Sequence, residues 1–247
     1  MPICLVHFQK GNNLNKIFLL ISIGLSAIYV ALSESGIAGI ETESGGLLYR
    51  LIVIAALLFC CVRAFGGANG GGAALAGALG LGVFAVNEVY AFAYIYLLGG
   101  NAGDVTVANI SRNCAYLFFL TATLRLIPRA PKFLRAVLSA LSSVAMLLIF
   151  YGVIADIHAI LYYPALGIMV LCTGFAVYLL IRGDKPARIF AGSVIAVGLI
   201  DSLNRILVIF DFGHHWRDVV LSLFPPAYLL ICFALIGLKR EEEASYE

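Results

Sequence analysis

The sequence predicts an all-helical fold: a polytopic membrane bundle of about eight transmembrane helices, without a soluble domain. The first observation is composition, since 62% of the 247 residues are hydrophobic and only 12% are charged, with a mean hydropathy of +1.00. The second is that windows of roughly 20 apolar residues, enough to cross about 30 Å of hydrocarbon, recur along the whole chain. We therefore expect residues 1–247 to form a single integral membrane domain.

The third observation is where the basic residues lie. The apolar windows place the spans at about residues 17–32, 47–65, 73–98, 105–124, 133–155, 159–181, 189–209 and 219–238. If the N-terminus is cytoplasmic, most Lys and Arg residues fall in cytoplasmic segments, and only Arg50 and Arg217 fall outside. Since Lys and Arg accumulate on the cytoplasmic side, this segregation supports eight spans, a multi-pass topology and cytoplasmic N- and C-termini. The net charge of +2 reflects the same bias and gives no reason to expect nucleic acid as a partner.

The first window is the shortest and has two interpretations. Lys10 and Lys16 precede it, and Ser33 and Ser35 follow it. A basic, an apolar and a small-residue region in this order also describe a signal peptide, whose cleavage would leave seven helices. We expect the helix to be retained.

Glycines mark the connection between the second and third windows. They cluster in residues 66–72 and recur at Gly77, Gly80 and Gly82. The cluster predicts a tight cytoplasmic turn, and the small residues at 73/77 and 76/80 predict a face for close helix packing. No Lys-Ser/Thr pair follows the glycines, so the pattern is not that of a phosphate-binding loop.

Four charged side chains lie inside apolar windows: Glu88 in the third, Arg112 in the fourth, and Asp201 and Arg205 in the seventh. Charge at membrane depth is costly unless it is paired or hydrated, so such residues mark a functional interior by default. At 1.5 Å per residue they lie about 6 to 15 Å below the expected external ends of their helices. Helical spacing places Asn and Tyr side chains on the same faces.

We therefore expect an outward-facing polar pocket between the third, fourth and seventh helices, which binds a small polar or amphipathic ligand. The expected ligand-binding residues are Asn87, Glu88, Arg112, Asn113, Tyr116, Asp201, Asn204 and Arg205. In this hypothesis the two arginines hold an anionic group, and the two acids hold a cationic or hydroxyl group or a proton.

The mouth of this pocket is expected at external loops. Its candidate residues are Asp156, His158, His214 and His215. Pro225 and Pro226 are expected to interrupt the start of the eighth helix, because proline frees backbone carbonyls that a cavity, water or a neighbouring helix must satisfy.

Two other interpretations stay open. Asp201 with Arg205, and Glu88 with Arg112, could form ion pairs that only lower the cost of insertion. Alternatively, the external acids and histidines, together with Asp201, could be catalytic. However, His214 and His215 are adjacent and lack the spacing of a zinc site, so we expect no metal and no cofactor.

The sequence does not match the patterns expected of most families of multi-helix membrane proteins that we considered. No lysine lies within a predicted span, which argues against a retinal-binding rhodopsin. In size and eight-helix topology, but in no motif, the chain resembles the lysoplasmalogenase family, and that resemblance implies a lipid hydrolase with membrane-embedded aspartates.

From the predicted polar pocket, the expected function is a receptor or sensor subunit or a transporter, with an intramembrane lipid-modifying hydrolase or a structural scaffold as alternatives. Expected partners are membrane lipids, a small-molecule or lipid ligand, and a cytoplasmic or membrane protein.

Overall fold

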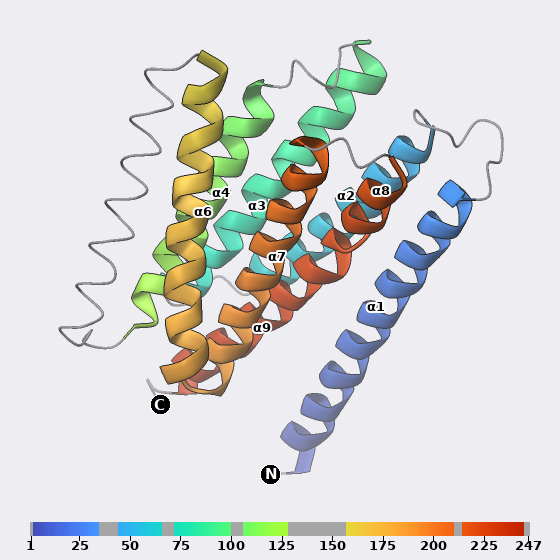
Figure 1. The fold of residues 1–247 in the computed structure, drawn as a ribbon. Helices are drawn as coiled ribbons and strands as arrows, with labels where there is room; N and C mark the ends of the chain where they lie inside the picture. The colour runs from blue at the N-terminus through green and yellow to red at the C-terminus, as the bar shows by residue number, and fades with distance from the viewer. Residues whose placement is uncertain are drawn as a thin grey trace.

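The structure of the protein is a computed structural model that describes residues 2–34, 44–65, 72–99, 106–127, 157–209 and 214–244. Within these helices, the side chains of residues 2–15, 33–34, 44–47, 106–113, 157–166, 205, 208–209, 214–215, 217 and 239–244 lie outside the description. Every regular element of the described ranges is a helix: α1 (Pro2–Glu34), α2 (Ser44–Phe65), α3 (Gly72–Phe92), the π-helix η1 (Ala93–Leu97), α4 (Thr106–Arg125), α6 (Ile157–Arg182), α7 (Lys185–Ile209), α8 (His214–Leu221) and α9 (Phe224–Ala244). The long helices pack side by side as a bundle (Figure 1).

The helices agree with the predicted spans in the part of the chain that the structure describes. Four are long and apolar enough to cross a membrane, with spans at Leu48–Phe65, Gly72–Leu97, Lys185–Asn204 and Asp218–Leu238. Shorter apolar segments, Lys16–Leu32, Cys114–Arg125 and Gly167–Arg182, lie in three further predicted spans. The predicted fifth span, residues 133–155, falls outside the described residues. An all-helical membrane protein with several candidate spans is therefore confirmed.

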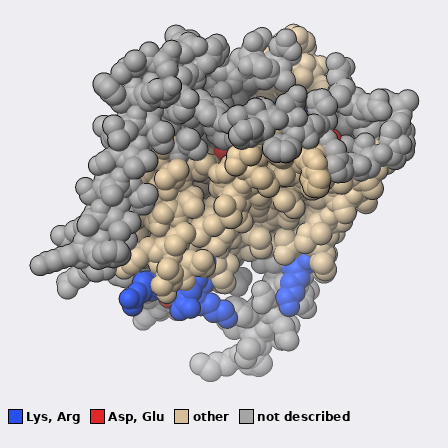
Figure 2. All heavy atoms as spheres, in the orientation of Figure 1, with Lys and Arg blue, Asp and Glu red and all other residues tan. Residues whose placement is uncertain are grey.

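Basic side chains gather at one end of the bundle. Arg63, Arg125 and Arg182 lie in the last turns of α2, α4 and α6, and Lys185 and Arg188 lie in the first turn of α7. Figure 2 shows Lys and Arg side chains at the lower end of the described surface, below a belt of uncharged residues. We refer to these five residues as the basic end. Such a belt next to a basic end is the surface pattern of a membrane-embedded helical bundle.

Small residues let α3 approach its neighbours closely. Ala73, Ala76, Gly77 and Gly80 are all buried. A Cβ atom at Gly80 would lie 2.8 Å from Cε1 of Phe119 and 3.2 Å from the carbonyl oxygen of Ala115, both on α4. A Cβ at Gly77 would overlap the side chain of Leu235 on α9. The predicted packing face is thus confirmed, and it positions α3 between α4 and α9.

The eighth predicted span, residues 219–238, is interrupted near its start, as expected from Pro225 and Pro226. The chain forms two helices, α8 and α9, joined by a turn at Ser222 and Leu223 in which the N–H of Leu223 donates to the carbonyl of Val220 at 3.1 Å. Pro225 and Pro226 follow in the first turn of α9. The missing proline N–H groups cost little there, because the first N–H groups of a helix have no intrahelical acceptor.

Two other predicted boundaries differ from the structure. His214 and His215 were expected in a loop, but they are the first two residues of α8. The expected N-terminal tail is helical, because α1 begins at Pro2 and continues into the apolar segment without a break. Both helices pack against the bundle, and the hydroxyl of Tyr29 in α1 donates to Oδ1 of Asp218 in α8 at 3.0 Å.

The packing of α3 predicts a difference between two glycines of the same helix. Gly80→Ala should lower the free energy of unfolding by about 1–3 kcal/mol, because the new methyl group meets a buried ring and a backbone carbonyl. Gly82→Ala is the matched control, since its Cβ would meet only the Phe65 ring at an ordinary 3.6 Å. Thermal unfolding of both variants in detergent measures the difference; equal stability of the two would contradict the close α3–α4 packing.

Candidate functional site

Two of the predicted site residues meet in the interior. The hydroxyl of Tyr116 in α4 donates a hydrogen bond to Oδ2 of Asp201 in α7 at 3.1 Å. Both residues are only 1% exposed. A hydrogen bond to a carboxylate in a low-dielectric interior is stronger than the same bond in water. This contact joins the fourth and seventh helices at the depth of the predicted polar face.

The inner face of α3 carries the predicted acid and amide. Phe84, Asn87, Glu88 and Ala91 were expected on one face, and all four are buried. Their spacing of three and four residues accounts for this, since such residues neighbour one another on a helix surface. Two polar side chains of α3 are therefore directed to the protein side of the helix rather than to lipid.

Glu88 has a partner that sequence reasoning missed. Nη1 of Arg50 in α2 lies 3.1 Å from Oε2 of Glu88, and the two side chains are 23% and 10% exposed. The sequence analysis counted Arg50 among the external basic residues. In the structure it is the seventh residue of α2, which begins at Ser44. A long basic side chain near the outer end of one span can reach an acid lying deeper in the next, and this was the signal available in the sequence.

Other predicted residues stay untested. Arg112 and Asn113 lie in α4 and Arg205 lies in α7, but their side chains are outside the description. The hypothetical Glu88–Arg112 and Asp201–Arg205 ion pairs therefore remain predictions. For the predicted mouth, Asp156 lies outside the described residues, and the helices α6 and α8 include His158, His214 and His215 in their first turns without described side chains.

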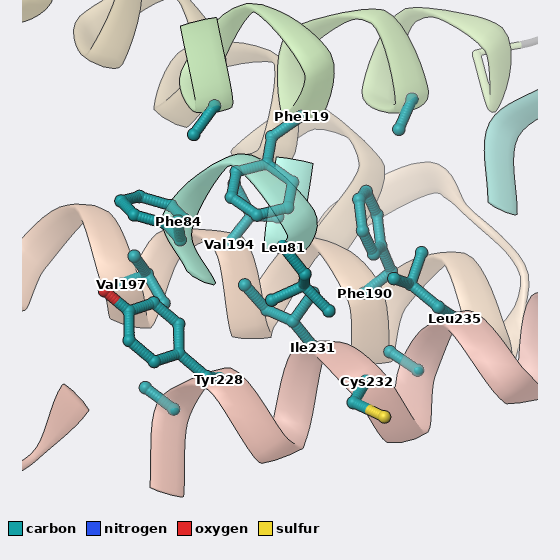
Figure 3. Packing of buried hydrophobic residues seen from close by; sticks show 14 of the residues in the cluster. Leu81, Phe84, Phe119, Phe190, Val194, Val197, Tyr228, Ile231, Cys232 and Leu235 are labelled. Atoms are coloured by element: carbon teal, nitrogen blue, oxygen red, sulfur yellow. The ribbon is translucent and has the colours of Figure 1, made fainter. Parts of the chain in front are cut away.

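An aromatic cluster lies next to the polar residues. The ring of Phe84 in α3 is 5.9 Å from Tyr116 and 5.2 Å from Tyr228 in α9, and Tyr228 stacks on Phe224 at 5.6 Å. Figure 3 shows Tyr228 grouped with Phe84 and with Val197 of α7. The contribution of α9 was not predicted, because its apolar sequence carries no face that distinguishes a site residue from a lipid-facing one. These rings close the protein interior on one side of the polar groups.

Two buried amide oxygens lack a hydrogen-bond donor. They are Oδ1 of Asn87 and Oδ1 of Asn204. An unpaired buried polar atom costs about 1–3 kcal/mol, and native proteins retain few of them without a functional reason. Both residues were predicted site residues, and their unsatisfied state is the feature of this region that packing alone does not explain.

The two amides lie on different helices, Asn87 on α3 and Asn204 on α7. Asn87 is three residues beyond Phe84, and Asn204 is three residues beyond Asp201, while Phe84 and Asp201 both contact Tyr116. Helices α3 and α7 run in the same direction, away from the basic end (Figure 1). Three residues correspond to about 4.5 Å of rise, so Asn87 lies almost one turn beyond Phe84 along α3, and Asn204 lies almost one turn beyond Asp201 along α7. We refer to Asn87, Glu88, Asp201 and Asn204 as the polar layer.

The polar layer consists of carboxylate and amide side chains. Carboxylate and amide oxygens accept hydrogen bonds from hydroxyl, ammonium and guanidinium groups. In the part of the chain that the structure describes, no three His, Cys, Asp or Glu residues gather closely enough to hold a metal ion. The described groups therefore suit a ligand that donates hydrogen bonds.

The Arg50–Glu88 pair predicts energetic coupling between α2 and α3. Arg50→Met and Glu88→Gln should each destabilise the protein, and the double variant should be less destabilised than their sum by about 0.5–3 kcal/mol, because each single change leaves one partner unpaired. Denaturation of the four proteins in detergent gives this coupling energy. Strict additivity would show that the pair contributes no interaction.

The Tyr116–Asp201 hydrogen bond makes a second prediction. Tyr116→Phe removes only the phenolic oxygen and should cost about 1–3 kcal/mol of unfolding free energy, because the buried carboxylate loses a donor. In an Asp201→Leu background the same change should cost far less, since no acceptor remains. Thermal unfolding measures both; an equal cost in the two backgrounds would contradict the bond's contribution to stability.

Comparisons with known protein families, with curated proteins and with solved structures find no match for this chain. A functional proposal consequently has to be argued from the residues and contacts described above.

Proposed function

We propose that this chain is a multi-pass membrane protein that binds a small polar or amphipathic ligand in a polar interior open to the external side, and that it acts as a transporter or as a receptor or sensor subunit. One observation carries the proposal. Among the residues that the structure describes, the amide oxygens of Asn87 and Asn204 are buried without a donor, on the same two helices as the buried acids Glu88 and Asp201, which do have partners. A ligand that supplies donors would remove the cost of these unpaired atoms.

The proposed topology has eight spans with both termini in the cytoplasm. Helices α4 and α6 run in the same direction (Figure 1), so the chain between them has to return across the bilayer. The apolar window at residues 133–155 is long enough for that return and is the proposed fifth span. The basic end then faces the cytoplasm under the positive-inside rule, and the polar layer lies toward the external side.

Each polar residue has a proposed role. Arg112 and Arg205 hold an anionic group of the ligand, while Asn87, Asn113 and Asn204 orient it through hydrogen bonds. Because Glu88 already pairs with Arg50, it binds a cationic group only by exchanging partners. Such an exchange would couple binding to a movement between α2 and α3, which is the kind of two-state contact that transport and signalling both require.

The mouth of the site is proposed at the outer ends of α6 and α8, where the sequence places Asp156, His158, His214 and His215. The two helices adjoin the outer end of α7, which carries Asp201 and Asn204. A protein partner, if the chain signals, would contact the basic end, since no soluble output domain is expected from the sequence.

Native mass spectrometry of the gently solubilised protein, followed by thermal shift with co-purifying molecules, lipids and metabolites, tests the proposal. We expect a specific small molecule to bind and raise the unfolding temperature, and Arg112→Ala or Asp201→Asn to abolish the shift. Asp184→Asn is the matched control, because Asp184 caps α7 at the basic end by accepting from the N–H of Ala187 at 3.1 Å. Substitution there should leave binding intact.

Liposome assays then distinguish a transporter, a receptor or sensor subunit, and a hydrolase from one another. Flux of the bound molecule identifies a transporter, and saturable binding without flux identifies a receptor or sensor subunit. Turnover of a lipid that is lost in Asp201→Asn would replace the proposal with the hydrolase alternative. A protein that carries no small molecule and that no compound stabilises would contradict ligand binding and favour a scaffold with structural ion pairs.

A further inference from the structure

We infer that the basic end is a binding surface for the headgroups of anionic phospholipids. This inference goes beyond the proposed function, because it concerns a surface outside the polar layer and does not depend on the ligand bound there. The side chains of Arg125, Arg182, Lys185 and Arg188 are exposed, and that of Arg63 is partly exposed. Figure 2 shows Lys and Arg side chains gathered at this end of the described surface. A surface of this charge attracts anions.

The charge of the basic end is not neutralised by described parts of the chain. Among the residues that the structure describes, none of the five basic side chains forms an ion pair. Asp184, an acid at this end, already caps α7 by accepting from the N–H of Ala187 at 3.1 Å. Nε of Arg63 is buried without an acceptor. Since this nitrogen only donates, the group that completes it must bring an acceptor, and phosphate oxygens are strong acceptors for guanidinium groups.

Arg125 lies where a second positive group is already present. Its guanidinium packs on the first residue of α3, since a Cβ atom at Gly72 would overlap Nη1 of Arg125. The first N–H groups of a helix have no intrahelical acceptor and carry a partial positive charge. Arg125 cannot neutralise them, so both groups favour an anion at this edge of the bundle.

The depth of the basic residues favours a lipid over a cytoplasmic protein. Arg63 lies inside the apolar span Leu48–Phe65. Arg125 and Arg182 each end an apolar segment, and Lys185 begins one. Long basic side chains at the margin of the hydrocarbon extend to the level of the lipid headgroups. A soluble protein can contact only the parts of the basic end that extend past this layer, so lipid is the nearer partner.

The test adds dioleoyl-phosphatidylglycerol or dioleoyl-phosphatidylcholine, which have the same acyl chains but different headgroup charge, to the full chain in dodecyl maltoside. We expect only phosphatidylglycerol to raise the unfolding temperature and to be retained in native mass spectrometry. High salt should reduce the rise, because interactions between exposed charges are screened.

Arg182→Gln combined with Lys185→Gln is the test variant, since both side chains are exposed and the change should not disturb folding. It should weaken the retention of phosphatidylglycerol by about five-fold for each lost charge. The matched control is Arg182→Lys, which keeps the charge and should keep the rise in unfolding temperature. If the double variant does not fold, Arg125→Gln and Arg125→Lys provide the same comparison at the start of α3.

Three results would overturn the inference. The first is equal stabilisation by the two lipids. The second is stabilisation by inorganic phosphate or an acidic peptide that equals the effect of phosphatidylglycerol, which would identify a soluble anion or a protein as the partner. The third concerns Glu241, Glu242 and Glu243, whose side chains lie outside the description: if these acids occupy the surface, only the variant with three glutamines in their place will respond to phosphatidylglycerol. Each of these results leaves the small-molecule test of the polar layer unaffected.

Discussion

At membrane depth no bulk water competes for hydrogen bonds, so each polar side chain has to find its partner on its own helix, on a neighbouring helix or in a ligand. The interior of this bundle follows from that constraint. Glu88 is paired with Arg50 from α2, and Asp201 accepts from Tyr116 of α4. The first pair joins two consecutive helices, α2 and α3, and the second joins α4 to the distant α7, so both pairs help to fix how these helices meet.

The same lack of bulk water makes the unpaired amide oxygens of Asn87 and Asn204 costly. In a soluble protein, a partly buried asparagine oxygen can be satisfied by a transient water molecule. At the depth of Asn87 and Asn204 that supply is restricted, and an unpaired acceptor is a lasting cost. In the proposed function, a donor supplied by the ligand would remove that cost and stabilise the protein.

The glycines and alanines of α3 contribute indirectly to the position of the aromatic cluster. Close approach at Gly80 and Gly77 sets α3 against α4 and α9, and Phe84, one turn beyond Gly80, thereby contacts Tyr116 and Tyr228. Without a hydrophobic driving force between helices in lipid, this backbone proximity supplies much of the packing energy. Small residues therefore determine the position of the aromatic cluster, and the cluster in turn bounds the polar layer.

Hydropathy and helical period were sufficient to predict the fold class, most helix positions, the packing face of α3 and the inward direction of Asn87 and Glu88, because these properties depend on residues near one another in the chain. The partners were decided only by tertiary structure. Arg50 was counted as an external base, and Tyr228 had no signal, since both act through contacts between distant segments. The helical state of His214 and His215 was likewise not predicted, whereas the interruption of the eighth span near Pro225 and Pro226 was. Local pattern identifies which side chains point inward, whereas three-dimensional packing decides what each one meets.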